Sequence, residues 1–259
     1  MCIFMMTGVC CVPVSPVRAE PLHKSEMTTQ LLFGEAVEVM EKGPENWIFI
    51  RCLYDNYEGW TTRSHFTEIP ELVAKEKWHL ASDWSNEILF HDQPMHIPFG
   101  SELRGLKNGH AEWGKYSWSF KGNHIDPATT RKNEKTIIRF SHQFLNTPYL
   151  WGGRSIFGID CSGFCQVVYK SLGVPLLRDA WQQATQGEGI GFLQEVKCGD
   201  LAFFDNEEGK ITHVGILLND RQIIHSSGKV RIDGIDSQGI LNTDTQERTH
   251  KLRLIKRYF

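Results

Sequence analysis

A cysteine at the expected start of a helix is the strongest candidate nucleophile in this chain. A Pro- and Gly-rich loop ends at Asp160, a good N-cap, and apolar residues then recur at helical spacing as far as Leu172. Cys161 therefore occupies the first helical position, where unpaired N–H groups and the helix dipole favour a thiolate. A thiolate is a nucleophile, although a free cysteine taken alone is more often a small buried hydrophobe.

Two histidines downstream can act with this thiol. The segments 213–218 and 222–226 read as a β-hairpin, and a loop with an odd number of residues places His213 directly opposite His225 on one face. A strict two-residue loop instead turns His225 to the other face. In the first register, His213 deprotonates the thiol or pairs with the thiolate, and His225 orients the ring of His213.

The same three residues have other interpretations. The histidines can be two structural residues of a sheet, and a Cys/His/His set can hold zinc, although the close-spaced ligand pair typical of zinc sites is missing. Their combination with a cysteine at a helix start favours acyl transfer. The backbone N–H of Cys161, with the Tyr149 hydroxyl, would then stabilise the oxyanion.

The elements around these residues predict an α+β catalytic domain over residues 129–259. A helix is expected over 130–145, and the helix that begins at Cys161 follows it. Strands are then expected over 200–204, 212–218, 222–226, 229–232 and 252–257. Helices followed by a run of strands are typical of an antiparallel sheet with helices on one side.

The N-terminal half reads as β-structure. We expect a strand over 9–17, short strands and turns over 31–67, a linker over 70–77 and a second β-rich segment over 78–125. The sequence thus predicts one small β-domain over residues 1–70 and a second, diverged one over 71–128. Both precede the catalytic domain.

Composition limits the classes of function. The chain has 259 residues and a net charge of −3, so nothing favours a nucleic acid as partner, and no apolar run is long enough to span a bilayer. Its seven cysteines have irregular spacing and no CxxC pair, so we expect reduced thiols in a cytoplasmic monomer without metal or cofactor. The segment Met1–Ala19 has some features of a signal peptide but no early Lys or Arg. A periplasmic or secreted location is the alternative.

Six motifs, in order, resemble the NlpC/p-sixty cysteine peptidases of bacterial cell-wall metabolism. They are Tyr149–Gly153, Asp160–Phe164, Arg178–Asp179, Gly199–Phe204, His213–Ile216 and Ile224–Ser226. The N-terminal half, through stretches such as Gln30–Glu35 and Tyr57–Trp60, is similar to the SH3-like domains of γ-D-glutamyl-L-diamino-acid endopeptidases.

The resemblance implies a papain-like core, preceded by two SH3-like barrels, with Cys161, His213 and His225 as the triad. It implies cleavage of the γ-D-Glu to diamino-acid bond of peptidoglycan stem peptides. An SH3-like domain would roof the cleft, and Glu26 there would hold the free amine of L-Ala. Further substrate-binding residues implied are Tyr57 or Trp60, Tyr149, Trp151, Asp160 and Ser162.

Some points stay open on the sequence. Glu26 can equally be a solvated loop carboxylate, and Asp160 can be only an N-cap. Many relatives carry Ser where this chain has Ala180. An amidase or acyltransferase would use the same thiolate, and a non-catalytic peptidoglycan-binding protein would use only the SH3-like units. The sequence does not choose between Lys and diaminopimelate as the diamino acid.

Overall fold

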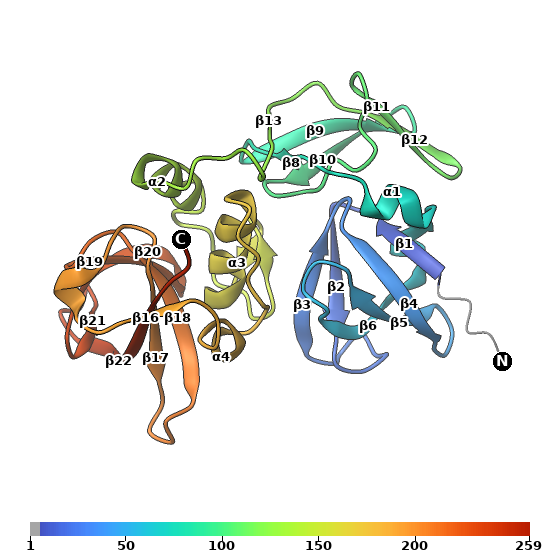
Figure 1. Cartoon of the computed structure of the whole chain (residues 1–259). Helices are drawn as coiled ribbons and strands as arrows, with labels where there is room; N and C mark the ends of the chain where they lie inside the picture. The colour runs from blue at the N-terminus through green and yellow to red at the C-terminus, as the bar shows by residue number, and fades with distance from the viewer. Residues whose placement is uncertain (1–5) are drawn as a thin grey trace. The chain divides into compact units, whose positions relative to one another are not determined.

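The chain folds into two compact units, Met1–Pro127 and Ala128–Phe259. The computed structural model describes residues 6–259 (Figure 1). Cys2 and the first part of the Met1–Ala19 segment lie outside this range.

The first unit begins with a seven-stranded antiparallel sheet in the order β3-β2-β6-β5-β4-β1-β7. Its strands are β1 (Met6–Cys10), β2 (Val14–Arg18), β3 (Met27–Leu32), β4 (Ala36–Lys42), β5 (Trp47–Cys52), β6 (Glu58–Thr62) and β7 (Phe66–Glu68), with a 3₁₀ turn η1 (Arg63–His65) before β7. The prediction of one strand over 9–17 is wrong. That segment is split because β1 pairs with β4 and β7, whereas β2 pairs with β3 and β6.

A second set of strands completes the first unit. The short helix α1 (Glu71–Lys75) lies in the segment expected to be a linker. Strands β9 (Ser85–Phe90), β10 (Gln93–Pro98), β11 (His110–Trp113) and β12 (Tyr116–Ser119) form one sheet, and β8 (Leu80–Ala81) pairs with β13 (His124–Ile125).

A shared apolar core joins the two sets of strands. The ring of Phe33, from the end of β3, lies 4.8 Å from that of Trp113 and 5.5 Å from that of Trp118, and all three are buried. Arg104 donates to the carbonyl of Gly34 and pairs with Glu102 in the same buried region. Because this core is common to both sets, residues before and after α1 belong to one compact unit.

Helices open the second unit. Helix α2 (Glu134–His142) is shorter than the predicted 130–145 and is capped by the side chain of Asn133. The predicted start of the next helix is confirmed: α3 (Cys161–Ser171) begins at the cysteine and has Asp160 as its N-cap. The short hairpin β14 (Arg154–Ser155) and β15 (Gly158–Ile159) precedes it, and α4 (Ala180–Gln183) follows. Within residues 6–259, no helix has the length and apolarity that a bilayer crossing requires.

The second unit continues as an antiparallel sheet that closes on itself. Its strands are β16 (Glu188–Ile190), β17 (Leu201–Asp205), β18 (Ile211–Leu217), β19 (Gln222–Ser227), β20 (Lys229–Asp236), β21 (Gly239–Leu241) and β22 (Arg248–Arg257), with a 3₁₀ turn η2 (Leu193–Glu195). The long β22 pairs with both β17 and β21, so β17 to β22 form a six-stranded barrel (Figure 1). The predicted order of helices and then antiparallel strands is thus confirmed.

Candidate active site

The N-terminus of α3 is held rigidly by the residue before the cysteine. The Asp160 carboxylate accepts from the N–H of Gly163 at 2.6 Å and from the N–H of Gly152 at 2.9 Å. It also forms a two-fold ion pair with the buried Arg178, at 3.1 and 2.6 Å. A Cβ on Gly163 would lie 2.3 Å from the carbonyl oxygen of Gly153, so the close approach of loop and helix requires glycine.

Cys161 lies at this helix start, and the residue is only 7% exposed. Burial and the neighbouring Asp160 carboxylate raise the pKa of Cys161 to about 12, although the backbone N–H groups of Val214 and Ser162 donate to the sulfur and lower it. The expectation of a low-pKa thiolate is therefore wrong for the resting protein. Removing the thiolate from water costs more free energy than the N-terminus of the helix returns by stabilising the charge.

The two predicted histidines lie together. Nε2 of His213 is 2.9 Å from Nδ1 of His225, and both side chains are buried. The residue directly opposite His225 is Gly215, so the predicted direct pairing of 213 with 225 is wrong. An odd number of residues joins the paired Leu217 and Ile223, so both histidines still share one face and meet diagonally.

A carboxylate that sequence reasoning missed extends this pair. Asp233, on β20, is 2% exposed, and its Oδ2 lies 3.0 Å from Nε2 of His225. The same carboxylate accepts from Arg231 at 2.8 and 2.9 Å and from the N–H of Thr243 at 2.9 Å. Burial alone would raise the pKa of Asp233, but the bonds from His225, Arg231 and Thr243 outweigh it and hold that pKa well below its usual range.

A third histidine packs on His213. The ring of His250, from β22, is stacked on that of His213 with centroids 4.1 Å apart and planes 25° apart. Burial, followed by the repulsion of His225 and His250, lowers the pKa of His213 well below its ordinary value. Burial and His225 likewise lower the pKa of His250 to about 4. His213 is therefore a neutral imidazole near neutral pH.

Both missed residues lie where strands are longer than predicted. The expected strand over 229–232 stopped one residue before Asp233, and the expected strand over 252–257 began two residues after His250. Side chains alternate between the two faces of a strand, so a longer predicted strand would have placed each of these residues on the face that carries the histidines. Asp233, for example, lies opposite Ile223 and diagonal to His225.

The loop before Cys161 carries most of the remaining predicted site residues. Tyr149 is half-buried, and burial followed by the charges of Cys161 and Asp160 raises the pKa of its phenol, so the hydroxyl stays protonated beside the thiol. Trp151 is 61% exposed. The Ser162 hydroxyl accepts from Arg178 at 2.9 Å. The structure thus brings Tyr149, Asp160 and Ser162 to the surroundings of the thiol.

The other predicted substrate-binding residues belong to the first unit. Glu26 is exposed and lies in the loop between β2 and β3, where its carbonyl accepts from the N–H of Ala19 at 3.0 Å. Tyr57 is half-buried and packs against the core of the first sheet. Trp60 lies on β6, with its ring 5.2 Å from that of Phe49.

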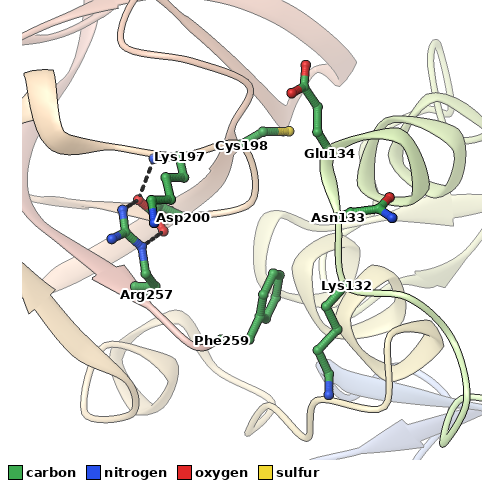
Figure 2. A pocket seen from close by; sticks show the side chains of 8 residues that line it. All are labelled: Lys132, Asn133, Glu134, Lys197, Cys198, Asp200, Arg257 and Phe259. Carbon is green, nitrogen blue, oxygen red and sulfur yellow. Dashed lines mark hydrogen bonds and ion pairs between the residues drawn. The ribbon is translucent and has the colours of Figure 1, made fainter.

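A separate pocket of about 500 Å³ in the second unit contains a different cysteine. It is lined by Lys132, Asn133, Glu134, Lys197, Cys198, Asp200, Arg257 and Phe259, and Figure 2 shows Arg257 and Asp200 facing one another. Burial, Glu134 and Asp200 raise the pKa of Cys198 to about 11. None of the residues that line this pocket is a histidine, so it lacks the combination of cysteine and histidine found at the N-terminus of α3.

Comparison with known proteins agrees with this geometry. Residues 146–249 match the NlpC/P60 family, and residues 17–66 match the bacterial dipeptidyl-peptidase SH3 domain. The γ-D-glutamyl-L-lysine dipeptidyl-peptidase of Bacillus subtilis is 48% identical over 215 residues, which cover 76% of this chain and 71% of that relative. Dipeptidyl-peptidase 6 of Lysinibacillus sphaericus is 23% identical over 266 residues, or 90% of this chain and 93% of the relative.

A solved structure has the same fold. An NlpC/P60 family protein from Bacillus cereus superimposes with a TM-score of 0.81 and 21% identity, covering 97% of this chain and 99% of that one. The sequence matches and the shared fold lead to one conclusion: this chain belongs to the NlpC/P60 family of cysteine peptidases and carries an SH3 domain ahead of its peptidase domain.

Proposed function

We propose that this peptidase hydrolyses the bond between γ-D-Glu and the diamino acid, Lys or diaminopimelate, in peptidoglycan stem peptides that have a free N-terminal L-Ala. The observation that carries the proposal is the buried, hydrogen-bonded pair of His213 and His225, with the sulfur of Cys161 accepting from the N–H of Val214, the residue after His213. The protein is also 48% identical to a γ-D-glutamyl-L-lysine dipeptidyl-peptidase. A nucleophile, a base and a group that orients the base are the parts that acyl transfer needs.

In the proposed reaction, the sulfur of Cys161 attacks the γ-carbonyl carbon of D-Glu while the thiol proton passes to His213. The C–N bond then breaks, and His213 gives that proton to the amino group of the departing diamino acid. A thioester now joins L-Ala-γ-D-Glu to Cys161. Water attacks this thioester with His213 as base, the dipeptide leaves, and the thiol recovers its proton.

The oxyanion of each step needs hydrogen-bond donors. The backbone N–H groups at the start of α3 point out of the helix terminus, and the Tyr149 phenol is protonated beside the sulfur. We assign the oxyanion to the N–H of Cys161 and the hydroxyl of Tyr149. Trp151, Asp160 and Ser162 would line the same site, with Asp160 also acting as the N-cap.

Substrate selection is assigned to the first unit. Glu26 would bind the free ammonium group of L-Ala, with Tyr57 beside it, because an exposed carboxylate suits a charge-assisted hydrogen bond. We also propose that residues 71–128 are a second, diverged SH3-like domain, supported by the four-stranded sheet β10-β9-β12-β11, and that the catalytic domain spans 129–259. We further propose that the protein is a monomer and that it works in the cytoplasm. A requirement for a free L-Ala would suit peptides already released from the wall.

Mass spectrometry of the products tests the function. The tripeptide L-Ala-γ-D-Glu-L-Lys, its diaminopimelate counterpart and the N-acetylated form of each would be incubated with the protein. We expect release of the dipeptide L-Ala-γ-D-Glu and the free diamino acid from the unblocked peptides. Cleavage of L-Ala alone, or transfer of the dipeptide to an added amine in preference to water, would contradict the proposal and favour an aminopeptidase or an acyltransferase.

A further inference from the structure

A buried carboxylate at the far end of the histidine pair has no part in the reaction described so far. Its side chain is 1% exposed, and its Oδ2 is 3.0 Å from Nε2 of His225. We propose that Asp233 is a positioning residue that fixes the tautomers of His225 and His213, and thereby leaves Nδ1 of His213 free to take the thiol proton. The inference rests on the roles proposed above for Cys161, His213 and His225.

The ionised carboxylate of Asp233 accepts hydrogen bonds and donates none. Its two oxygens face donors only: Arg231, the N–H of Thr243 and the ring of His225. An ionised carboxylate has no proton to give, so Nε2 of His225 must carry the hydrogen of the 3.0 Å contact.

The tautomer of His225 then decides that of His213. A neutral imidazole protonated at Nε2 has a lone pair at Nδ1. Nδ1 of His225 therefore accepts, and Nε2 of His213, at 2.9 Å, must donate. His213 is buried and neutral, so its own lone pair lies at Nδ1. That atom is the base which the proposed attack requires.

Arg231 prevents the carboxylate from turning. Its Nε donates to Oδ2 and its Nη2 to Oδ1 of Asp233, a two-point contact that holds the carboxylate plane. Arg231 lies directly opposite His225 on the sheet, so the clamp and the imidazole approach Asp233 from neighbouring strands. Only one placement of the hydrogens therefore satisfies the contacts among Asp233, His225 and His213.

The variant Asp233→Asn tests this arrangement because an amide carries both a donor and an acceptor. At the Oδ1 position an NH₂ would face two donors, Arg231 and the N–H of Thr243. At the Oδ2 position it would face only one, the Nε of Arg231, and could donate to His225. The second orientation is favoured, and it forces the proton of His225 to Nδ1.

The consequence passes along the pair. His225 protonated at Nδ1 donates to Nε2 of His213, which then carries its hydrogen at Nδ1 and can no longer accept from the thiol. We expect kcat of Asp233→Asn to fall by about 100-fold or more, with KM changed by less than about threefold. The wrong tautomer of His213 prevents proton transfer from the thiol, which is part of the chemical step and not of substrate binding. The matched control is Asp236→Asn, which lies on the same strand and pairs with Arg248 but has a side chain that is 47% exposed. It should keep wild-type kcat.

Nuclear magnetic resonance of ¹⁵N-labelled histidine reads the tautomers without relying on activity. In the intact protein near neutral pH, we expect His225 protonated at Nε2 and His213 protonated at Nε2, and in Asp233→Asn we expect both hydrogens at Nδ1. A doubly protonated His225 in the wild type, or unchanged tautomers and kcat in Asp233→Asn, would overturn the proposal. The Cys161→Ala variant separates the proposed function from the inference about Asp233. If this variant still hydrolyses substrate, the proposed function fails. The tautomers of both histidines can be read in it in either case.

Discussion

At the residue scale, the sulfur and the imidazole of this site are both neutral at rest. Burial keeps the proton on Cys161 and off His213, while two N–H groups already point at the sulfur. The thiolate then exists chiefly during the reaction, when the proton has moved to His213. Donors fixed in advance are the means by which a dry site stabilises charge that appears only in the transition state.

This charge state predicts the pH dependence of activity. Because the pKa of His213 lies well below 6.5, the base stays unprotonated as the pH falls through that value, and because the pKa of Cys161 is about 12, the thiol does not ionise first as the pH rises. We expect kcat, which reports groups in the enzyme–substrate complex, to be nearly constant from about pH 6.5 to pH 8.5. A bell-shaped profile with both limbs inside that range would indicate a preformed thiolate–imidazolium pair instead.

Two cysteines on one helix give a matched test of the nucleophile. Cys161→Ala should lower hydrolysis by at least about 10⁴-fold and leave the fold intact, because it removes the attacking atom. Cys165, one turn further along α3, is fully buried in the core. Cys165→Ala should keep kcat and lower the free energy of unfolding by about 1 kcal/mol. Activity assays and urea denaturation of both variants check this, and a Cys161→Ala protein with wild-type turnover would exclude the thiol as nucleophile.

At the scale of elements, the site depends on a diagonal row across three strands. His213, His225 and Asp233 come from β18, β19 and β20, and each meets the next one diagonally. The position directly opposite His225 is taken by Gly215, which leaves space for the imidazole. A Cβ there would lie 2.8 Å from Cβ of His225 and 2.7 Å from Cδ1 of Ile223.

Gly215→Ala should therefore damage the chemistry more than the fold. The added methyl displaces His225, so we expect kcat to fall by about 10-fold or more and the free energy of unfolding by about 1–3 kcal/mol. Gly234→Ala, on β20, is the control, because its Cβ would meet Leu241 at an ordinary 3.5 Å. Equal kcat values for the two variants would show that the space beside His225 is not needed.

Helix and strand ends that are marked by nearby residues, such as an N-cap, could be predicted from the sequence. Strand ends and registers that depend on pairing with another strand could not. The start of α3 follows from Asp160 and the apolar spacing after it, and the structure confirms that start. The register of β18 on β19 depends on the turn between them, which one sequence does not specify, so the direct pairing of the histidines was wrong. Asp233 and His250 were missed because the ends of their strands are fixed by pairing with the adjacent strands and not by a local signal such as a cap or a turn residue.

At the scale of the whole molecule, the first unit is the part that the peptidase reaction itself does not explain. It carries the match to a bacterial dipeptidyl-peptidase SH3 domain over residues 17–66. A single shared core, which includes Phe33, joins this sheet to the strands after α1. Glu26, in an exposed loop of this unit, is the proposed selector of a free amino terminus.

Glu26→Gln keeps the shape of that side chain and removes its charge. It should lower kcat/KM on peptides with a free L-Ala by about one to two decades, the loss of a charge-assisted hydrogen bond worth about 1.5–3 kcal/mol. N-acetylated peptides should change little. Glu20→Gln, in the same loop, is the matched control. If the wild-type protein cleaves free and acetylated peptides equally well, the first unit does not select the amino terminus and is a wall-binding module.

The central claim is that Cys161 forms a thioester with L-Ala-γ-D-Glu. The most direct measurement is to mix the protein with excess L-Ala-γ-D-Glu-L-Lys, quench with acid within the first turnover, and map the modified peptide by mass spectrometry. The dipeptide should be attached to Cys161 and to no other cysteine, with one equivalent of lysine released. Attachment at another residue, or release of lysine by the Cys161→Ala protein, would contradict it.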